Sequence, residues 1–183
     1  MECQPLALPE VVLIKPRVFE DARGWFYESF NADRFAALVG VQSTFVQDNH
    51  SRSAKSVLRG LHYQLAPHAQ GKLVRVLRGA VFDVAVDIRP TSTHFGKWVG
   101  VELSESNRHQ LWIPPGFAHG FVALSEGTEV LYKTTDFWHP ASERSIRWDD
   151  PSIGIHWPMQ GAPVLNGKDL AARLLSEAEL PEH

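Results

Sequence analysis

The sequence of 183 residues has almost no cysteine: Cys3, near the N-terminus, is the single one. This excludes an internal disulfide framework and a zinc site built from cysteines, and it fits a reducing compartment, so we expect a cytoplasmic protein. An excess of one charge is also missing, because 18 Lys and Arg stand against 21 Asp and Glu, a net charge of −3. We therefore expect neither nucleic acid nor a membrane surface as a partner.

Long hydrophobic runs and linkers are missing as well. No run of about 18 apolar residues could span a membrane, and Glu2, Pro5, Pro9 and Glu10 rule out a signal peptide over the first residues. The chain has no internal repeat and no Ser/Gly-rich linker. At roughly 100–200 residues per domain, we expect one domain over residues 1–183. Its expected parts are an extended segment at 1–12, a barrel at 13–165 and a helix at 166–180.

Short segments rich in β-branched and aromatic residues are abundant. Turn signals such as Arg78-Gly79 separate several of them, and no long helices alternate with them. This pattern predicts an all-β sandwich, jelly roll or barrel and excludes a doubly wound nucleotide-binding fold. The expected strands are Leu13–Phe19, Trp25–Phe30, Thr44–Asp48, Val57–Gln64, Lys72–Leu77, Ala80–Ile88, Lys97–Leu103, His109–Ile113, Phe121–Leu124 and Thr128–Phe137.

Two segments carry helical signals instead. Asn31 is a good N-cap and Gly40 is a good residue to end a helix, so the sequence predicts a short helix over residues 32–39. Asp169–Ala178 combines good helix formers with an apolar stripe. It predicts a C-terminal helix that packs on the barrel.

The strand Val57–Gln64 is the most informative segment for function. Because side chains alternate along a strand, His62 and Gln64 are expected on one face, with Arg59 and Tyr63 on the other. Polar side chains on one face of a small barrel strand indicate a lined cavity. The alternative is a buried histidine that is satisfied by a backbone carbonyl. In a cavity, His62 would be the natural base, because histidine titrates near neutral pH.

A second segment, Ile113–Phe121, contains Pro-x-Gly-x-x-His and resembles the second half of the cupin signature, with His119 at its end. Metal cupins also supply His-x-His and a Glu. Here His62 fits the first position, Gln64 replaces the second histidine, and no Glu lies between His62 and Glu102. Because a metal needs about three or four good ligands, we expect a cupin-like double-stranded β-helix that has kept its cavity without a metal.

Such a cavity indicates organic acid–base chemistry. A carboxylate that orients His62 would strengthen it as a base, and the residues alone leave this partner open. The candidates are Asp48, Asp83, Asp87, Asp136 and Asp169. Of the cationic residues Arg23, Arg59 and Lys72, the last two are close to His62 in the sequence and favour a diphosphate site, since Arg and Lys are the usual phosphate partners. No glycine-rich phosphate loop of the Walker or dinucleotide-binding type is present.

Seven motifs in this order and spacing together resemble the dTDP-4-dehydrorhamnose 3,5-epimerase family from about Ile14 to Leu180. They are Phe19-x-Asp21-x-Arg23-Gly24-x-Phe26-x-Glu28, Phe45–Ser51, Leu58–Gln64, Gly71–Arg75, Pro114-x-Gly116-x-x-His119-Gly120, Glu129-Val130-x-Tyr132-Lys133 and Lys168-Asp169. The resemblance implies a cupin fold and an isomerase without a cofactor. Its implied reaction inverts C3 and C5 of dTDP-4-keto-6-deoxy-D-glucose, giving dTDP-4-keto-L-rhamnose for dTDP-L-rhamnose biosynthesis.

The resemblance also implies catalytic roles. His62 would be the base that removes the C3 and C5 protons, and Asp169 would be its carboxylate partner. Tyr132 would be the acid that returns a proton from the opposite face. Lys72 would be the cation beside the C4 oxygen.

Substrate contacts and a homodimer are implied in the same way. Trp138 would stack on thymine. Arg23 and Glu28, near the N-terminus, would reach the neighbouring subunit's site. The implied contacts are Arg23, Glu28, Gln47, Asp48, Asn49, Arg59, Lys72, His119, Trp138, Glu143 and Lys168.

Three other functions remain open. A related enzyme would invert only C5 or only C3, or would act as a ketoisomerase. A metal cupin such as an oxygenase would need the ligands that the sequence lacks. A non-catalytic module would bind the dTDP-sugar without exchanging its protons.

Overall fold

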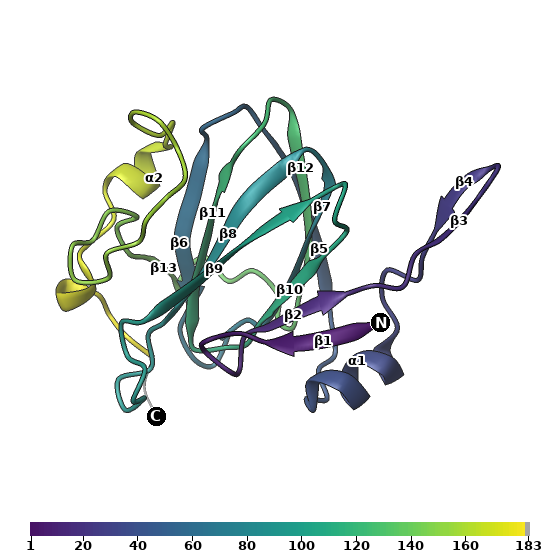
Figure 1. Cartoon of the computed structure of the whole chain (residues 1–183). Helices are drawn as coiled ribbons and strands as arrows, with labels where there is room; N and C mark the ends of the chain where they lie inside the picture. The colour runs from purple at the N-terminus through teal and green to yellow at the C-terminus, as the bar shows by residue number, and fades with distance from the viewer. Residues whose placement is uncertain (182–183) are drawn as a thin grey trace.

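Most of the regular secondary structure in the computed structural model, which describes residues 1–181, consists of short antiparallel strands (Figure 1). Most of them overlap the segments that the sequence predicted as strands. Their bounds are β1 (Glu2–Pro5), β2 (Val12–Lys15), β3 (Phe19–Asp21), β4 (Gly24–Phe26), β5 (Gln47–Ser53), β6 (Leu58–Gln64), β7 (Lys72–Arg78), β8 (Ala80–Asp87), β9 (Trp98–Ser104), β10 (Gln110–Ile113), β11 (Phe117–Ala123), β12 (Thr128–Thr134) and β13 (Glu143–Ser145).

Two sheets face each other and enclose the barrel interior (Figure 1). The six-stranded sheet has the order β1-β2-β10-β7-β12-β5, and the five-stranded sheet has the order β13-β6-β11-β8-β9. The paired strands run antiparallel in both sheets. The all-β, cupin-like jelly roll expected from the sequence is therefore confirmed.

The inward face of the strands changes from apolar to polar along the barrel. On β7, Val74 and Val76 are buried between the sheets with Phe121 and Val130. Burying each of these side chains contributes about 1.5–3 kcal/mol. Lys72 lies two residues before Val74 and therefore shares its face of β7. The apolar core thus stops where polar inward positions begin, and these positions form the cavity described below.

The helix α1 (Ala32–Val39) forms where the sequence predicts it. The Asn31 side chain accepts a hydrogen bond from the backbone N of Arg34 at 3.0 Å, and Gly40 ends the helix in the left-handed conformation with φ 74°. Its buried residue, Phe35, packs on the outer face of the six-stranded sheet.

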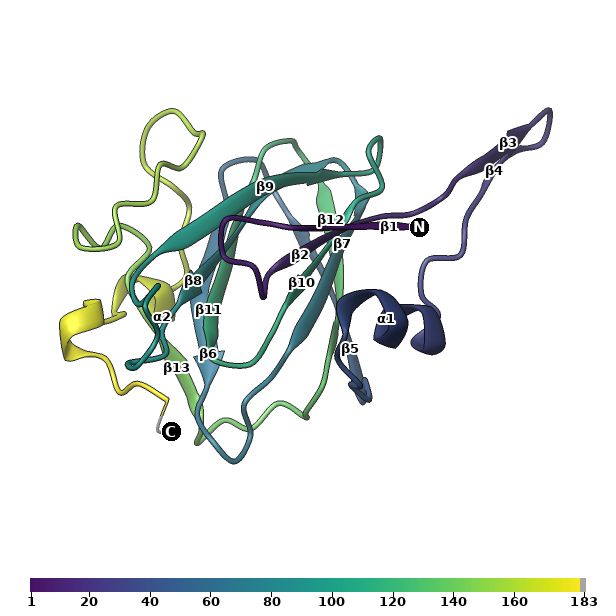
Figure 2. The same ribbon diagram turned by 60° about the horizontal axis from the view of Figure 1, so that its bottom comes forward.

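The prediction of a C-terminal helix over residues 166–180 is wrong. The chain forms a short helix, α2 (Gly167–Leu170), and a 3₁₀ turn, η1 (Leu175–Glu177). Between them, the backbone O of Arg173 accepts from the backbone N of Arg147 at 2.8 Å, as a strand residue would. This tertiary bond overrides the local helix propensity, which is a weak preference. The segment lies beside β6, at the opposite end of the molecule from α1 (Figure 2).

The predicted hairpin of Leu13–Phe19 and Trp25–Phe30 is shorter than expected. Pro16 has no N–H to donate and interrupts the first strand, so that only β3 and β4 pair with each other. The small hairpin projects away from the barrel (Figures 1 and 2). Among the described residues, no helix is long and apolar enough to cross a membrane.

Candidate active site

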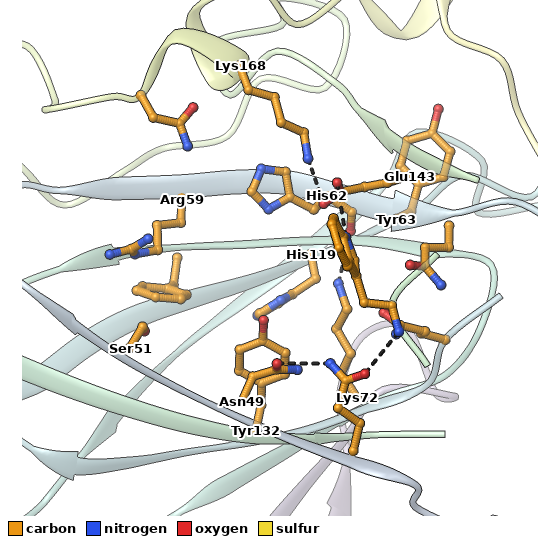
Figure 3. Close-up of a pocket in the computed structure, with 16 residues that line it drawn as sticks. Asn49, Ser51, Arg59, His62, Tyr63, Lys72, His119, Tyr132, Glu143 and Lys168 are labelled. Atoms are coloured by element: carbon orange, nitrogen blue, oxygen red, sulfur yellow. Dashed lines mark hydrogen bonds and ion pairs between the residues drawn. The ribbon is translucent and has the colours of Figure 1, made fainter. Parts of the chain in front are cut away.

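A cavity of about 390 Å³ lies between the two sheets (Figure 3). Its walls come from both sheets and from the segments that carry Trp138 and Lys168. Two strands contribute more than the sequence predicted, because β5 continues to Ser53 and β11 begins at Phe117. The lining residues are Gln47, Asn49, Ser51, Arg59, His62, Tyr63, Gln64, Gln70, Lys72, His119, Phe121, Tyr132, Trp138, Glu143, Asn166 and Lys168.

His62 on β6 forms a close pair with Asp169 of α2. The His62 Nε2 lies 2.5 Å from Oδ1 of Asp169, whose carboxylate is fully buried. The Asn166 side chain caps α2 by accepting from the backbone N of Asp169 at 2.8 Å, which fixes the carboxylate in place. Of the five candidate aspartates, Asp169 is thus the one beside His62. A buried carboxylate there orients the imidazole and stabilises its protonated form.

The prediction that Arg59 and His62 lie on opposite faces of β6 is wrong. The pairing of β6 with β11 shifts register between these two residues, so that β6 holds one extra residue. Gly60 lies in this bulge with φ 130°, and a Cβ there would lie 2.5 Å from the Cα of Gly120. The bulge changes the phase of the side chains, and both Arg59 and His62 line the cavity.

Lys72, the first residue of β7, is a buried cation in the cavity. Its Nζ donates a hydrogen bond to the backbone O of His62 at 3.1 Å. Burial lowers the pKa of Lys72 to about 8, and the negative charges of Asp83 and Glu143 oppose this shift only in part. A desolvated ammonium of this kind stabilises negative charge on a nearby oxygen more strongly than an ammonium in water does.

His119 on β11 belongs to a second buried pair. Its Nε2 lies 3.0 Å from both carboxylate oxygens of Asp83. Burial lowers the pKa of His119, while Asp83 acts in the opposite direction. Asp83, a candidate partner for His62, therefore orients His119 instead. His119 lines the cavity, as expected, with a fixed ring orientation.

Tyr132 lines the same cavity from the other sheet. It stands on β12, whereas His62 stands on β6 (Figure 3). Burial raises the pKa of Tyr132, and the charge of Arg59 lowers it to a smaller extent. The hydroxyl therefore keeps its proton at neutral pH and can donate it. The cavity has a potential base on one wall and a potential acid on the other.

Glu143, Lys168 and Trp138 lie together at one side of the cavity. Lys168 Nζ is 2.6 Å from Oε1 of Glu143, and Trp138 Nε1 donates to Oε2 at 3.3 Å. Burial raises the pKa of Glu143, but the bonds from Lys168 and Trp138 outweigh it and lower the pKa overall. Trp138 itself is 57% exposed, so that its ring can stack on a planar ligand.

Of the three neighbours Gln47, Asp48 and Asn49, the first and third face the cavity. Gln47 Nε2 donates to Oδ1 of Asn49 at 2.9 Å. Asp48 points the other way, as alternation along β5 requires, and forms an exposed ion pair with Lys133 at 3.0 Å. The structure does not bring Asp48 to the cavity, and the implied contact of Asp48 with the substrate remains a prediction.

Arg23 and Glu28 also lie outside this cavity. The Arg23 side chain, at the projecting hairpin, is 89% exposed and pairs with Asp21. Glu28 pairs with Arg34 at 3.1 Å. Both positions fit residues that act on another subunit, which remains a prediction.

Five lining residues were not predicted: Ser51, Tyr63, Gln70, Phe121 and Asn166. Alternation from Asn49 along a longer β5 would have found Ser51, and Asn166 could have been recognised as an N-cap. Within residues 1–181, no group of three or more His, Cys, Asp or Glu side chains could hold a metal ion. The expectation of a reaction without a metal or other cofactor remains a prediction.

The barrel and the cavity define a cupin-like protein equipped for acid–base chemistry. The chain belongs to the dTDP-4-dehydrorhamnose 3,5-epimerase family, whose model matches residues 5–177. Enzymes of that name from Salmonella typhimurium and Pseudomonas aeruginosa are 58% and 57% identical to it, over 96% and 98% of both chains. The crystal structure of dTDP-6-deoxy-D-glucose-3,5-epimerase from Legionella pneumophila Philadelphia 1, in complex with dTDP-4-keto-L-rhamnose, matches with a TM-score of 0.96. That protein is 51% identical, and the match covers 100% of this chain and 98% of that one.

Proposed function

We propose that this protein is a dTDP-4-dehydrorhamnose 3,5-epimerase, which converts dTDP-4-keto-6-deoxy-D-glucose into dTDP-4-keto-L-rhamnose. The observation that carries the proposal is the His62–Asp169 pair on one wall of the cavity and Tyr132 on the other, with the Lys72 ammonium beside them. Relatives that are more than half identical carry this activity in their names. The Legionella relative was solved with dTDP-4-keto-L-rhamnose.

The first step removes a proton alpha to the C4 ketone. Neutral His62 accepts this proton, and the electron pair of the broken C–H bond moves to the C4 oxygen as an enolate. Asp169 stabilises the imidazolium that results. Lys72 donates a hydrogen bond to the enolate oxygen and lowers the energy of the developing charge.

The second step returns a proton to the same carbon from the opposite face. Tyr132 donates it, which restores the ketone and leaves a phenolate. Solvent then reprotonates Tyr132 and takes the proton from His62. A reorientation of the sugar ring lets the same two groups invert C3 and C5 in turn.

The remaining cavity residues support recognition of the nucleotide. Arg59 is held by a bond from its Nε to Oγ of Ser53 at 3.1 Å, and its guanidinium can bind the diphosphate. Trp138 can stack on thymine. The further proposed contacts to the dTDP-sugar are Gln47, Asn49, His119, Glu143 and Lys168.

Proton NMR of dTDP-4-keto-6-deoxyglucose with the protein in D₂O tests this function, with a reductase added in a second tube. We expect deuterium at both C3 and C5, and dTDP-L-rhamnose in the second tube. A His62→Ala variant should bind dTDP but lose the exchange. Exchange at one carbon only would identify a single-site epimerase. Binding of dTDP without any exchange would identify a binding protein and refute the His62–Asp169 mechanism.

We also propose a homodimer in which the projecting hairpin of one subunit completes the other's site. The hairpin exposes an apolar surface, with Phe19, Trp25 and Phe26 exposed by 51%, 59% and 70%. Such a surface is typical of an interface. It would bring Arg23 and Glu28, which lie outside their own cavity, to the neighbouring one.

Mixing two inactive variants tests the shared site. In a heterodimer of His62→Ala and Arg23→Ala subunits, one site has both residues intact and the other has neither. Random exchange of subunits should therefore restore up to about a quarter of the wild-type activity. No recovery, although light scattering shows that mixed dimers form, would contradict the proposed sharing.

A further inference from the structure

Gln64, the last residue of β6, occupies the position where a metal cupin has its second histidine. It is 5% exposed, and all of its side-chain hydrogen bonds go to the backbone of two loops. Nε2 donates to the backbone O of His68 at 2.6 Å and of Phe137 at 3.2 Å. Oε1 accepts from the backbone N of His139 at 2.8 Å. One planar amide thus uses both donors and its acceptor.

The two loops held in this way are residues 65–71 and 135–142. Trp138 lies between the two residues of the second loop that Gln64 binds. Its ring is largely exposed, so that hydrogen bonds rather than packing fix its place. Besides the bonds of Gln64 on either side, the backbone N of Trp138 donates to Oε1 of Gln47 at 3.0 Å.

The two loops also contact each other directly. The rings of His68 and His139 stack with centroids 3.9 Å apart and planes tilted by 21°. His68 Nδ1 lies 3.1 Å from Oδ2 of Asp136, and Gln70 Nε2 donates to the backbone O of Asp136 at 2.8 Å. Through its hydrogen bonds, Gln64 joins both loops to the strand of His62.

We propose that Gln64 is a positioning residue that holds the Trp138 loop in the conformation that binds the nucleotide. The inference rests on the proposed function, because it takes dTDP-sugar as the ligand. None of the side-chain hydrogen bonds of Gln64 goes to His62 or Tyr132, and all of them act on the loop backbone. Its loss should therefore weaken binding of the nucleotide and leave proton transfer in the bound complex nearly unchanged.

Two substitutions separate anchoring from folding. Gln64→Glu keeps the shape and the acceptor for His139, but it brings a carboxylate oxygen against two backbone carbonyls. Gln64→Met removes all three bonds. The matched control is Asn107→Asp in the turn between β9 and β10. The Asn107 amide also makes three bonds to backbone atoms, at 2.9–3.0 Å, and lies outside the cavity.

The measurements are calorimetric titration with dTDP, which gives Kd, and deuterium exchange into the substrate over a range of substrate concentrations, which gives kcat and KM. For both Gln64 variants we expect Kd and KM to rise roughly tenfold, the equivalent of about one lost hydrogen bond, with kcat within about threefold of wild type. Asn107→Asp should leave Kd, KM and kcat unchanged. Unchanged Kd and KM in folded Gln64 variants, or a fall in kcat alone, would overturn the proposal.

Amide hydrogen exchange of the free protein gives a readout that needs no ligand. Gln64→Met should speed exchange at residues 136–142 more than elsewhere, because the N–H of His139 loses its acceptor. Uniform acceleration over the whole barrel would mean a general loss of stability and would refute the anchoring role. If the proposed function itself is wrong, the wild-type protein will show no deuterium exchange into the substrate in the NMR assay. That result is distinct from any outcome of the amide exchange experiment.

Discussion

The buried Lys72 predicts a loss of activity on the alkaline side. Its ammonium is buried in the cavity, where it donates a hydrogen bond to the backbone O of His62. Burial lowers its pKa to about 8. If the cation stabilises the enolate, raising the pH through this value removes the group that stabilises the transition state. kcat/KM reports the ionisation of the free enzyme and is the quantity to follow.

The size of the effect follows from the pKa. With a pKa of about 8, roughly nine-tenths of Lys72 is charged at pH 7 and roughly one-tenth at pH 9. We expect kcat/KM to fall about tenfold between these two pH values. A lysine with an ordinary pKa near 10.5 would stay almost fully charged over the same range, and the profile would remain flat.

The assay is deuterium exchange into the substrate from pH 6 to 10, measured by NMR for the wild type and two variants. Lys72→Met should lower kcat/KM by roughly 10²–10⁴-fold at pH 7 and lose the inflection near pH 8. Lys55→Met removes an exposed lysine outside the cavity and should keep the wild-type profile. A wild-type profile that stays flat to pH 9.5 would refute the reasoning.

Three further substitutions test the rest of the site. Asp169→Asn should lower kcat by roughly 10²–10⁴-fold with dTDP affinity retained, because His62 loses its charged partner; calorimetry and exchange together check this. Tyr132→Phe should lower turnover by a similar factor, and a variant that still gives dTDP-L-rhamnose at the wild-type rate in the coupled assay would exclude Tyr132 as the acid. Trp138→Ala should weaken the binding of dTDP by about 1–3 kcal/mol with little change in kcat, and an affinity equal to that of the wild type would exclude base stacking.

Local pattern was a good guide to the strands and a poor guide to the C-terminus. β-Branched and aromatic runs located most barrel strands, since each must bury one face between the sheets. The predicted helix over Asp169–Ala178 failed because long-range bonds decide that segment. The backbone O of Arg173 accepts a hydrogen bond from the backbone N of Arg147, and the backbone N of Leu175 donates one to the carboxylate of Asp150. Propensity cannot register such partners.

The proposed catalytic pair shows the same limit from the functional side. His62 and Asp169 are 107 positions apart in sequence, and the residues alone left five aspartates as possible partners. Only the resemblance to a family singled out Asp169. Composition could not distinguish the buried pair of His119 and Asp83 from the pair of His62 and Asp169, since both consist of a strand histidine and a buried aspartate.

The bulge at Gly60 explains why strand alternation failed at the most informative segment. A regular strand would have turned Arg59 away from His62, and the cavity would have lost the cation that we propose for the diphosphate. Gly60 accepts φ 130° and the close approach of Gly120, and a side chain at this position would clash with the neighbouring strand. The irregularity is therefore what brings the proposed base and the proposed phosphate ligand into one cavity. Local rules fail here because the site requires a geometry that a regular strand does not have.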